Sequence, residues 1–191
     1  MDDIDVSISR FPVVDLVDLP EDLRARIEPI AERTGFVPNV FVGMGHRPDE
    51  LRAFMDYHDA LMERDSGLTK VEREMIVVAT SAANDCLYCV VAHGAILRIR
   101  TKEAELTDRI VANWRTAPVT DRQRAMLNVA VKMARTPEEV SEGDLADLRE
   151  LGFTDDDIWD IGSVTALFAL SNRIAHLADL QPNPEFFTLG R

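Results

Sequence analysis

Residues 69–93 read TKVEREMIVVATSAANDCLYCVVAH, and they predict a hairpin of two helices. Thr69 with Glu72 three residues later has the form of a capping box, in which each side chain bonds a free backbone amide at a helix start. The residues that follow are apolar on most faces, so this first helix is expected to run to about Ser81 and to be buried nearly all round.

The second helix of the hairpin carries the residues that point to chemistry. Asn84-Asp85 is expected to break and re-cap the chain, so that a helix runs from Cys86 to about Ile99. Cys86, Cys89 and His93 then share one helix face, with His93 one turn beyond Cys89. In the first turn, free backbone amides and the helix dipole favour a thiolate, which by itself selects Cys86 as the more acidic thiol. A C-x-x-C pair beside a histidine is typical of reversible dithiol chemistry.

A carboxylate on the first helix is a candidate partner for that histidine. Burying a lone charge is costly, so Glu74 on a buried helix needs a partner. If the two helices pack as a hairpin, Glu74 reaches His93 and forms a Glu–His–Cys relay with Cys89. Glu72 is the competing carboxylate, and we assign it to the helix cap.

Helical signals dominate the rest of the chain, and the only alternation typical of a strand lies in the first ten residues. We therefore predict an all-α fold with an extended lead-in over 1–20, one helical domain over 21–187 whose redox core is 68–100, and a short tail over 188–191. The other expected helices are Glu21–Arg33, Pro48 to about Arg64, Lys102–Trp114, about Thr120–Arg135, Ser141–Leu151 and Thr154 to about Leu180.

The composition of the 191 residues limits the class of protein. Apolar residues make up 46%, which is enough for a sizeable core and excludes a disordered chain. The net charge of −13 argues against nucleic-acid and anionic-lipid partners, since both need a basic surface. No stretch approaches a membrane span, and the acidic start is unlike a secretory signal, so we expect a cytoplasmic protein.

Three other interpretations of the cysteines remain open. Free cysteines in helices are often small buried apolar residues. Zinc would need further ligands, and His46, His58 and His176 show no paired metal spacing, so no metal or other cofactor is expected. A thioredoxin-type site belongs beside a βαβ unit, and the sequence shows none.

The spacing of these residues resembles a known signature. Glu74, then Cys86-x-x-Cys89, then His93 is similar to the motif of the AhpD-like alkylhydroperoxidases in the carboxymuconolactone decarboxylase superfamily. Softer matches over about residues 35–187 resemble the subgroup of peroxidase-related enzymes, and they comprise Leu151–Ile158, Asn172-Arg173 and Pro182–Phe186.

The resemblance implies an AhpD-like helical fold that assembles as a homo-oligomer, commonly a trimer or hexamer. It implies reduction of a small hydroperoxide, in which Cys89 attacks the peroxide, Cys86 resolves the sulfenic acid to a disulfide, and His93 with Glu74 relays protons. An external thiol or protein reductant would then reopen the disulfide. Tyr88 departs from the pattern, because the well-known hydroperoxidases have a histidine there. The Tyr88 hydroxyl is a candidate donor to the developing alkoxide, or else lies half-buried at the rim of the pocket.

Two other functions are compatible with the same signature. The wider superfamily includes decarboxylase and lactone-type chemistry that does not depend on a cysteine pair. A non-catalytic oligomeric module whose cysteines sense oxidants is the other. Unchanged activity in a Cys89→Ser variant would favour the first, and a disulfide that forms but never turns over would favour the second.

Overall fold

The computed structural model describes residues 7–191, and within that range the regular elements are all helical, with no strand. Residues 1–6, which include part of the predicted lead-in and of its alternating segment, lie outside the described residues. The α-helices are α1 (Glu21–Thr34), α2 (Asn39–Met44), α3 (Pro48–Met62), α4 (Lys70–Ala83), α5 (Leu87–Thr101), α6 (Ala104–Asn113), α7 (Asp121–Arg135), α8 (Glu142–Glu150) and α9 (Asp155–Ala178), and short 3₁₀ turns occupy Leu16–Asp18, Pro137–Glu139 and Pro184–Phe187.

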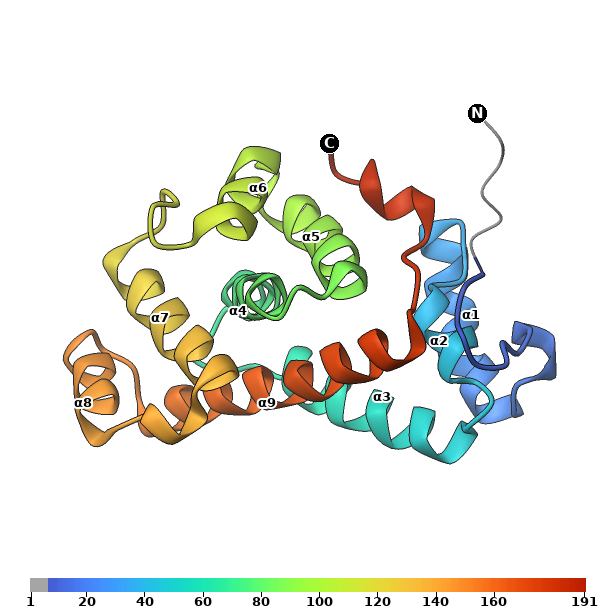
Figure 1. Cartoon of the computed structure of the whole chain (residues 1–191), viewed down its shortest axis with the longest axis horizontal. Coiled ribbons are helices and arrows are strands. Elements are labelled where there is room, and N and C mark those ends of the chain that lie inside the picture. The colour runs from blue at the N-terminus through green and yellow to red at the C-terminus, as the bar shows by residue number, and fades with distance from the viewer. Residues whose placement is uncertain (1–6) are drawn as a thin grey trace.

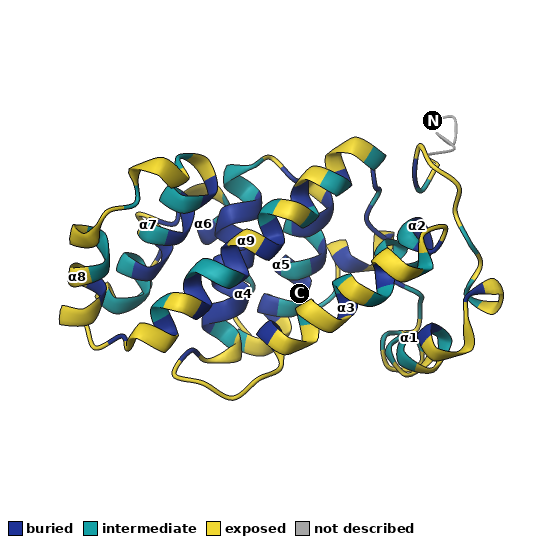
Figure 2. Cartoon of the chain, turned by 90° about the horizontal axis from the view of Figure 1, so that it is seen from below, coloured by how far each residue is buried: buried dark blue, intermediate teal, exposed yellow. Residues whose placement is uncertain are grey.

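Helix α4 is the central element of the fold. Figure 1 shows it end-on in the middle of the molecule, with α5, α6, α7 and α9 packed around it. The capping box predicted at its start is confirmed, since Thr69 and Glu72 exchange both backbone bonds. Residues 76–79 have no exposed surface at all, and Figure 2 shows the burial concentrated along α4 and the helices that face it. Such all-round burial accounts for the nearly continuous apolar sequence of α4.

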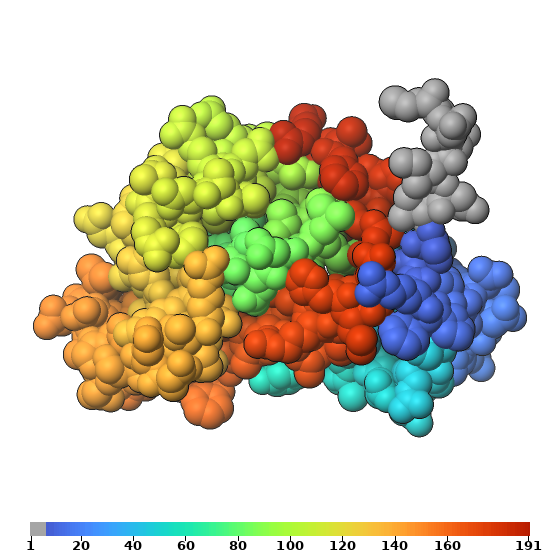
Figure 3. Space-filling view, viewed as in Figure 1, coloured from blue at the N-terminus to red at the C-terminus, as the bar shows by residue number. Residues whose placement is uncertain are grey.

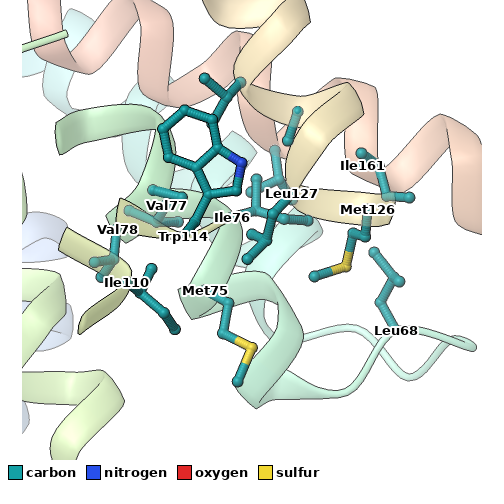
Figure 4. Close-up of a cluster of buried hydrophobic side chains, with 14 of the residues drawn as sticks. Leu68, Met75, Ile76, Val77, Val78, Ile110, Trp114, Met126, Leu127 and Ile161 are labelled. Atoms are coloured by element: carbon teal, nitrogen blue, oxygen red, sulfur yellow. The ribbon is translucent and has the colours of Figure 1, made fainter. Parts of the chain in front are cut away.

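The largest hydrophobic core lies around α4, in the half of the molecule that contains α6 to α9. Figure 4 shows side chains from α4 meeting those of α6, α7 and α9, with the Trp114 indole packed among them. The Trp114 Nε1–H donates to Asn128 Oδ1 at 3.0 Å, so the polar end of this large side chain is paired as well. The core holds α4 rigidly, and α4 in turn carries Glu74.

The junction between α4 and α5 differs from the prediction in one respect. Asp85 takes up a left-handed conformation with φ 54°, and the cap of α5 is Cys86 itself rather than Asp85. Short polar residues tolerate this conformation best, which explains how the chain turns so sharply without a glycine. Helix α5 therefore begins at Leu87, and Cys86 lies just before its first turn.

Other boundaries also move for local reasons. Helix α5 continues to Thr101 and ends where Lys102 becomes left-handed (φ 59°), so α6 begins two residues later than predicted, at Ala104. The short helix α2 is absent from the prediction. Pro38 stands at its N-cap.

The C-terminal segment packs against α5 and α6. The guanidinium of Arg98 donates from Nε to the carbonyl of Leu189 at 2.9 Å and from Nη2 to that of Phe186 at 2.6 Å. Arg191 forms a bidentate ion pair with Asp108. The residues predicted as a tail are thus held by polar contacts. Within residues 7–191, every helix is too short or too polar to cross a bilayer.

Candidate dithiol site

Both cysteines lie where α5 packs against the second half of α9. Figure 3 shows these two segments meeting on one face of the molecule. Cys86 and Cys89 are free thiols, each only 1% exposed. Cys89 Sγ is 3.6 Å from the hydroxyl oxygen of Ser171 on α9. The two thiols are therefore buried together, and α9 packs against them.

A polar network surrounds the two sulfur atoms. Asn172 is buried, donates from Nδ2 to the Ser81 hydroxyl at 3.0 Å, and accepts at Oδ1 from the Asn84 amide at 2.9 Å. Asn172 therefore makes a buried polar contact between α4 and α9. Its hydrogen bonding makes a small lowering contribution to the pKa of each thiol, which for Cys89 is outweighed by larger effects that raise the pKa. The asparagine thus links the end of α4, the cysteines and α9.

The two thiols differ strongly in acidity. The pKa of Cys86 is lowered to about 6, and the largest cause is a hydrogen bond with the Cys89 thiol. A hydrogen bond from the Cys89 backbone amide lowers the pKa further, whereas burial of the Cys86 thiol acts in the opposite direction. The hydrogen bond between the two thiols and burial raise the pKa of Cys89 well above the ordinary value. A backbone amide at a helix start favours a thiolate, as the sequence argument from the helix terminus expects. At neutral pH the structure favours a thiolate on Cys86 and a thiol on Cys89.

This asymmetry predicts the pH dependence of alkylation. Iodoacetamide reacts with the thiolate, so labelling of Cys86 in the native protein should rise with pH through a midpoint near 6. Cys89 should label only at much higher pH, because its pKa is raised. Peptide mass mapping measures each site, and the urea-unfolded chain is the control, in which both midpoints should lie near about 8.5. A native Cys86 midpoint equal to that control would contradict the assignment.

Glu74 and His93 form the hydrogen-bonded pair that the hairpin predicts. His93 Nδ1 is 2.9 Å from Glu74 Oε2, and the Glu74 carboxylate is 4% exposed. The guanidinium of Arg100 approaches Glu74 Oε1 at 3.8 Å, so this buried charge has two partners. Because the carboxylate accepts only, Nδ1 carries the proton and Nε2 is left for exchange. The Phe168 ring packs edge-on against the imidazole, with centroids 4.7 Å apart, and fixes its orientation.

His93 makes no direct hydrogen bond through which it could exchange a proton with Cys89 in this structure. Among residues 7–191, no hydrogen bond joins His93 to either cysteine, although the sequence places it one turn from Cys89. Proton transfer between them would need a bridging water or the closer approach that a bound substrate induces. The catalytic roles of these residues accordingly stay predictions.

Tyr88 lies inside the fold rather than half-exposed. Only 5% of it is exposed, and its hydroxyl oxygen accepts a hydrogen bond from the Val40 backbone amide at 3.0 Å. Burial raises the pKa of this phenol, so the hydroxyl stays protonated. Tyr88 ties α2 to the start of α5, and its role as a donor to an alkoxide is untested.

Two residues near the thiols do not emerge from the sequence as part of the site. Ser171 contacts Cys89, and His176, whose Nε2 is 2.8 Å from the Asn84 carbonyl, contributes through its charge to the low pKa of Cys86. The one signal is for His176, which lies four positions after Asn172 and therefore on the same face of α9. Among residues 7–191, no group of three potential metal ligands is arranged around a common point.

Comparison with known proteins places this site in a family. The model of the carboxymuconolactone decarboxylase family matches residues 48–111, which span α3 to most of α6. The AhpD core protein from Ralstonia eutropha JMP134, an uncharacterized peroxidase-related protein, is 57% identical, with a TM-score of 0.95 over 97% of this chain and 98% of that one. The chain belongs to the AhpD-like carboxymuconolactone decarboxylase family. An uncharacterized peroxidase-related protein from Silicibacter sp. TM1040 is 39% identical, with a TM-score of 0.89 over 97% of this chain and 100% of that one.

Other comparisons define how far this family membership extends. The debrominase Bmp8 has a TM-score of 0.80 over 96% of this chain and 95% of its own, but at 18% identity it shows a shared fold only. No protein sequence with curated function matches the chain. The AhpD-like helical fold and the predicted family are confirmed. Because the same fold also carries a debrominase, the reaction must be argued from the site.

Proposed function

We propose that this AhpD-like protein is a thiol-dependent hydroperoxide reductase that uses the Cys86–Cys89 dithiol. The observation that carries the proposal is the buried pair of free thiols, of which one has its pKa lowered to about 6. A thiolate that exists at neutral pH is the nucleophile that peroxide reduction needs. His93, one helical turn beyond Cys89 and hydrogen-bonded to Glu74, can carry protons in the steps that follow the attack on the peroxide.

The proposed reduction of a hydroperoxide has three steps. A thiolate attacks the terminal peroxide oxygen, the O–O bond breaks, and the alcohol leaves after protonation, so that the sulfur becomes a sulfenic acid. The second sulfur attacks the first, forms the S–S bond and releases water. An external thiol or protein reductant then reopens the disulfide by exchange. In the order implied by the family, Cys89 attacks and Cys86 resolves, whereas the low pKa of Cys86 favours Cys86 as the attacking sulfur.

The test is turnover in a defined assay. The wild-type protein should reduce hydrogen peroxide or an alkyl hydroperoxide continuously with dithiothreitol as the reductant, and the rate should follow protein concentration. The double variant Cys86→Ser with Cys89→Ser is the matched control and should show only the uncatalysed rate. Equal rates for the two proteins would refute the proposal.

We also propose a homo-oligomer, a trimer or hexamer, working in the cytoplasm. Exposed apolar side chains along α9 support assembly, since Trp159 is 74% exposed, Leu177 66% and Leu170 49%. Free thiols are kept reduced in the cytoplasm, which suits a dithiol enzyme. Light scattering during size-exclusion chromatography measures the mass, and a monomeric mass across the working concentration range would count against assembly.

A further inference from the structure

Ser171 carries the one side-chain hydroxyl, among the residues that the structure describes, that lies within hydrogen-bonding distance of a cysteine sulfur. Its oxygen is 3.6 Å from Cys89 Sγ, and it comes from 82 positions further along the chain. Ser171 is half-buried on α9, whereas Cys89 is only 1% exposed on α5. The packing of α9 against α5 therefore brings a polar group to an otherwise enclosed thiol.

The Ser171 hydroxyl has no other hydrogen bond within residues 7–191. A hydroxyl in the middle of a helix commonly bonds back to the carbonyl four residues earlier, and Thr165 on the same helix does so, donating to the Ile161 carbonyl at 2.8 Å. Ser171 makes no such bond, so its proton is free to point at the sulfur. Serine is also a poorer helix former than alanine, so the helix itself gains nothing from a hydroxyl at this position.

The surroundings of Cys89 offer little else that stabilises a charge on its sulfur. Cys89 packs in an apolar cluster that includes Ala92 and Phe186. Its own backbone amide bonds the sulfur of Cys86. His93 has no hydrogen bond with either thiol in the described part of the chain. A charged sulfur in such a place is costly unless a side chain donates a hydrogen bond to it.

Two neighbouring residues of α9 can supply that hydrogen bond. Hydrogen bonding from Ser171 and from Asn172 favours a thiolate on Cys89, although the Cys86 thiol and burial raise the Cys89 pKa by more. Asn172 is already committed, since it donates to the Ser81 hydroxyl and accepts from the Asn84 amide. Ser171 is the donor whose proton has no competing acceptor between residues 7 and 191.

We propose that Ser171 is a further catalytic residue of the dithiol reaction, whose hydroxyl donates a hydrogen bond to the Cys89 sulfur when that sulfur is a thiolate. The inference rests on the proposed function and adds a residue to its site. While Cys89 is protonated, its S–H donates to the serine oxygen. When Cys89 gives up its proton to water or to His93, the serine O–H turns and donates to the sulfur. The O–H bond stays intact, so the serine stabilises a charge and transfers no proton.

This role applies whichever cysteine attacks the peroxide. If Cys89 attacks, its thiolate forms the S–O bond as the O–O bond breaks, and the departing alkoxide takes up a proton. If Cys86 attacks, Cys89 must still become a thiolate to attack the Cys86 sulfenic acid. It then forms the S–S bond and displaces hydroxide, which becomes water on protonation. In both orders, loss of the Ser171 hydroxyl slows the step in which Cys89 acts.

The pH midpoint of Cys89 alkylation tests the hydrogen bond without any peroxide. All proteins carry Cys86→Ala, which leaves Cys89 as the one thiol and puts no new hydroxyl beside it. Adding Ser171→Ala should raise the midpoint of iodoacetamide labelling by about one pH unit or more, as expected when a hydrogen bond to a charged group is lost. Ser171→Thr keeps the hydroxyl and should leave the midpoint close to that of the parent. An unchanged midpoint in Ser171→Ala would overturn the inference.

Ser163→Ala is the matched control for this experiment. Ser163 is also a half-buried serine on α9, and within residues 7–191 it makes no hydrogen bond with either thiol, so its replacement should not move the midpoint. A merely steric role for Ser171 would change the labelling rate at high pH, where Cys89 is fully ionised, and would leave the midpoint where it was. That result, or equal shifts in the two alanine variants, would contradict the assignment.

Disulfide formation in the protein with both cysteines gives the second readout. After one equivalent of hydrogen peroxide at neutral pH, Ser171→Ala should form the Cys86–Cys89 disulfide about tenfold more slowly than wild type, and Ser171→Thr should stay close to wild type. The difference should shrink at high pH, where Cys89 ionises without the serine. Equal rates for Ser171→Ala and wild type would overturn the inference and leave the proposed function intact. A wild-type protein that forms no disulfide would refute the proposed function, and with it a catalytic role for Ser171.

Discussion

Replacing Glu74 with glutamine should lower the steady-state rate of peroxide reduction on the order of 10²-fold, the loss typical of a disabled acid–base group. The amide keeps the size of the side chain but removes the charge that faces His93 Nδ1 at 2.9 Å. His93 can then no longer be stabilised as an imidazolium while it carries a proton. The measurement is the turnover number with a saturating thiol reductant.

The matched control for this variant is Glu63→Gln. Glu63 also approaches Arg100, at 3.9 Å, but it is half exposed and makes no contact with the imidazole. Its replacement should leave turnover within about twofold of wild type, as expected for an exposed ion pair. Wild-type turnover in Glu74→Gln, or an equal loss in both variants, would contradict a specific role for the Glu74–His93 pair.

Replacing Asp160 with alanine should destabilise the protein by about 3–5 kcal/mol, the range for breaking a buried ion pair. Asp160 on α9 is 1% exposed, and its Oδ2 atom accepts from Nη2 of Arg73 on α4 at 3.1 Å. The Arg73 side chain has no exposed surface, so the variant leaves a buried cation without its carboxylate. Arg64 and Ser66 bond the same carboxylate from the α3–α4 loop.

Urea unfolding at neutral pH measures this loss, and two variants serve as comparisons. Asp160→Asn keeps an acceptor for Ser66 and should lose less stability than the alanine variant. Asp147→Ala, at an exposed position on α8, should leave the free energy of unfolding essentially unchanged. An Asp160→Ala variant as stable as Asp147→Ala would show that the cluster does not hold α4 against α9.

The features of the fold that the sequence predicts correctly are those set by neighbours along the chain. The capping box at Thr69 and Glu72 involves residues only three apart, so the local sequence is enough to predict it. The Glu74–His93 pair requires one further assumption, that consecutive apolar helices pack as a hairpin. That assumption holds because α4 and α5 are joined by only three residues.

The remaining features depend on tertiary packing that no local pattern encodes. The sharp turn at Asp85, which makes Cys86 the cap instead of the first helical residue, is one backbone conformation among several open to Asn-Asp. Ser171 and His176 reach the thiols because α9 folds back across α5 from more than 80 positions along the chain. The helix-start argument selects Cys86 as the more acidic thiol, whereas the family resemblance implies attack by Cys89. The hydrogen bond between the two thiols lowers the pKa of Cys86, in agreement with the first argument.

Mass spectrometry of the intact protein after one equivalent of hydrogen peroxide tests the dithiol account most directly. The account predicts the loss of two hydrogens per chain, mapped by peptide analysis to a disulfide between Cys86 and Cys89, and its reversal by dithiothreitol. Free thiols that persist on both residues after prolonged exposure to peroxide would contradict it.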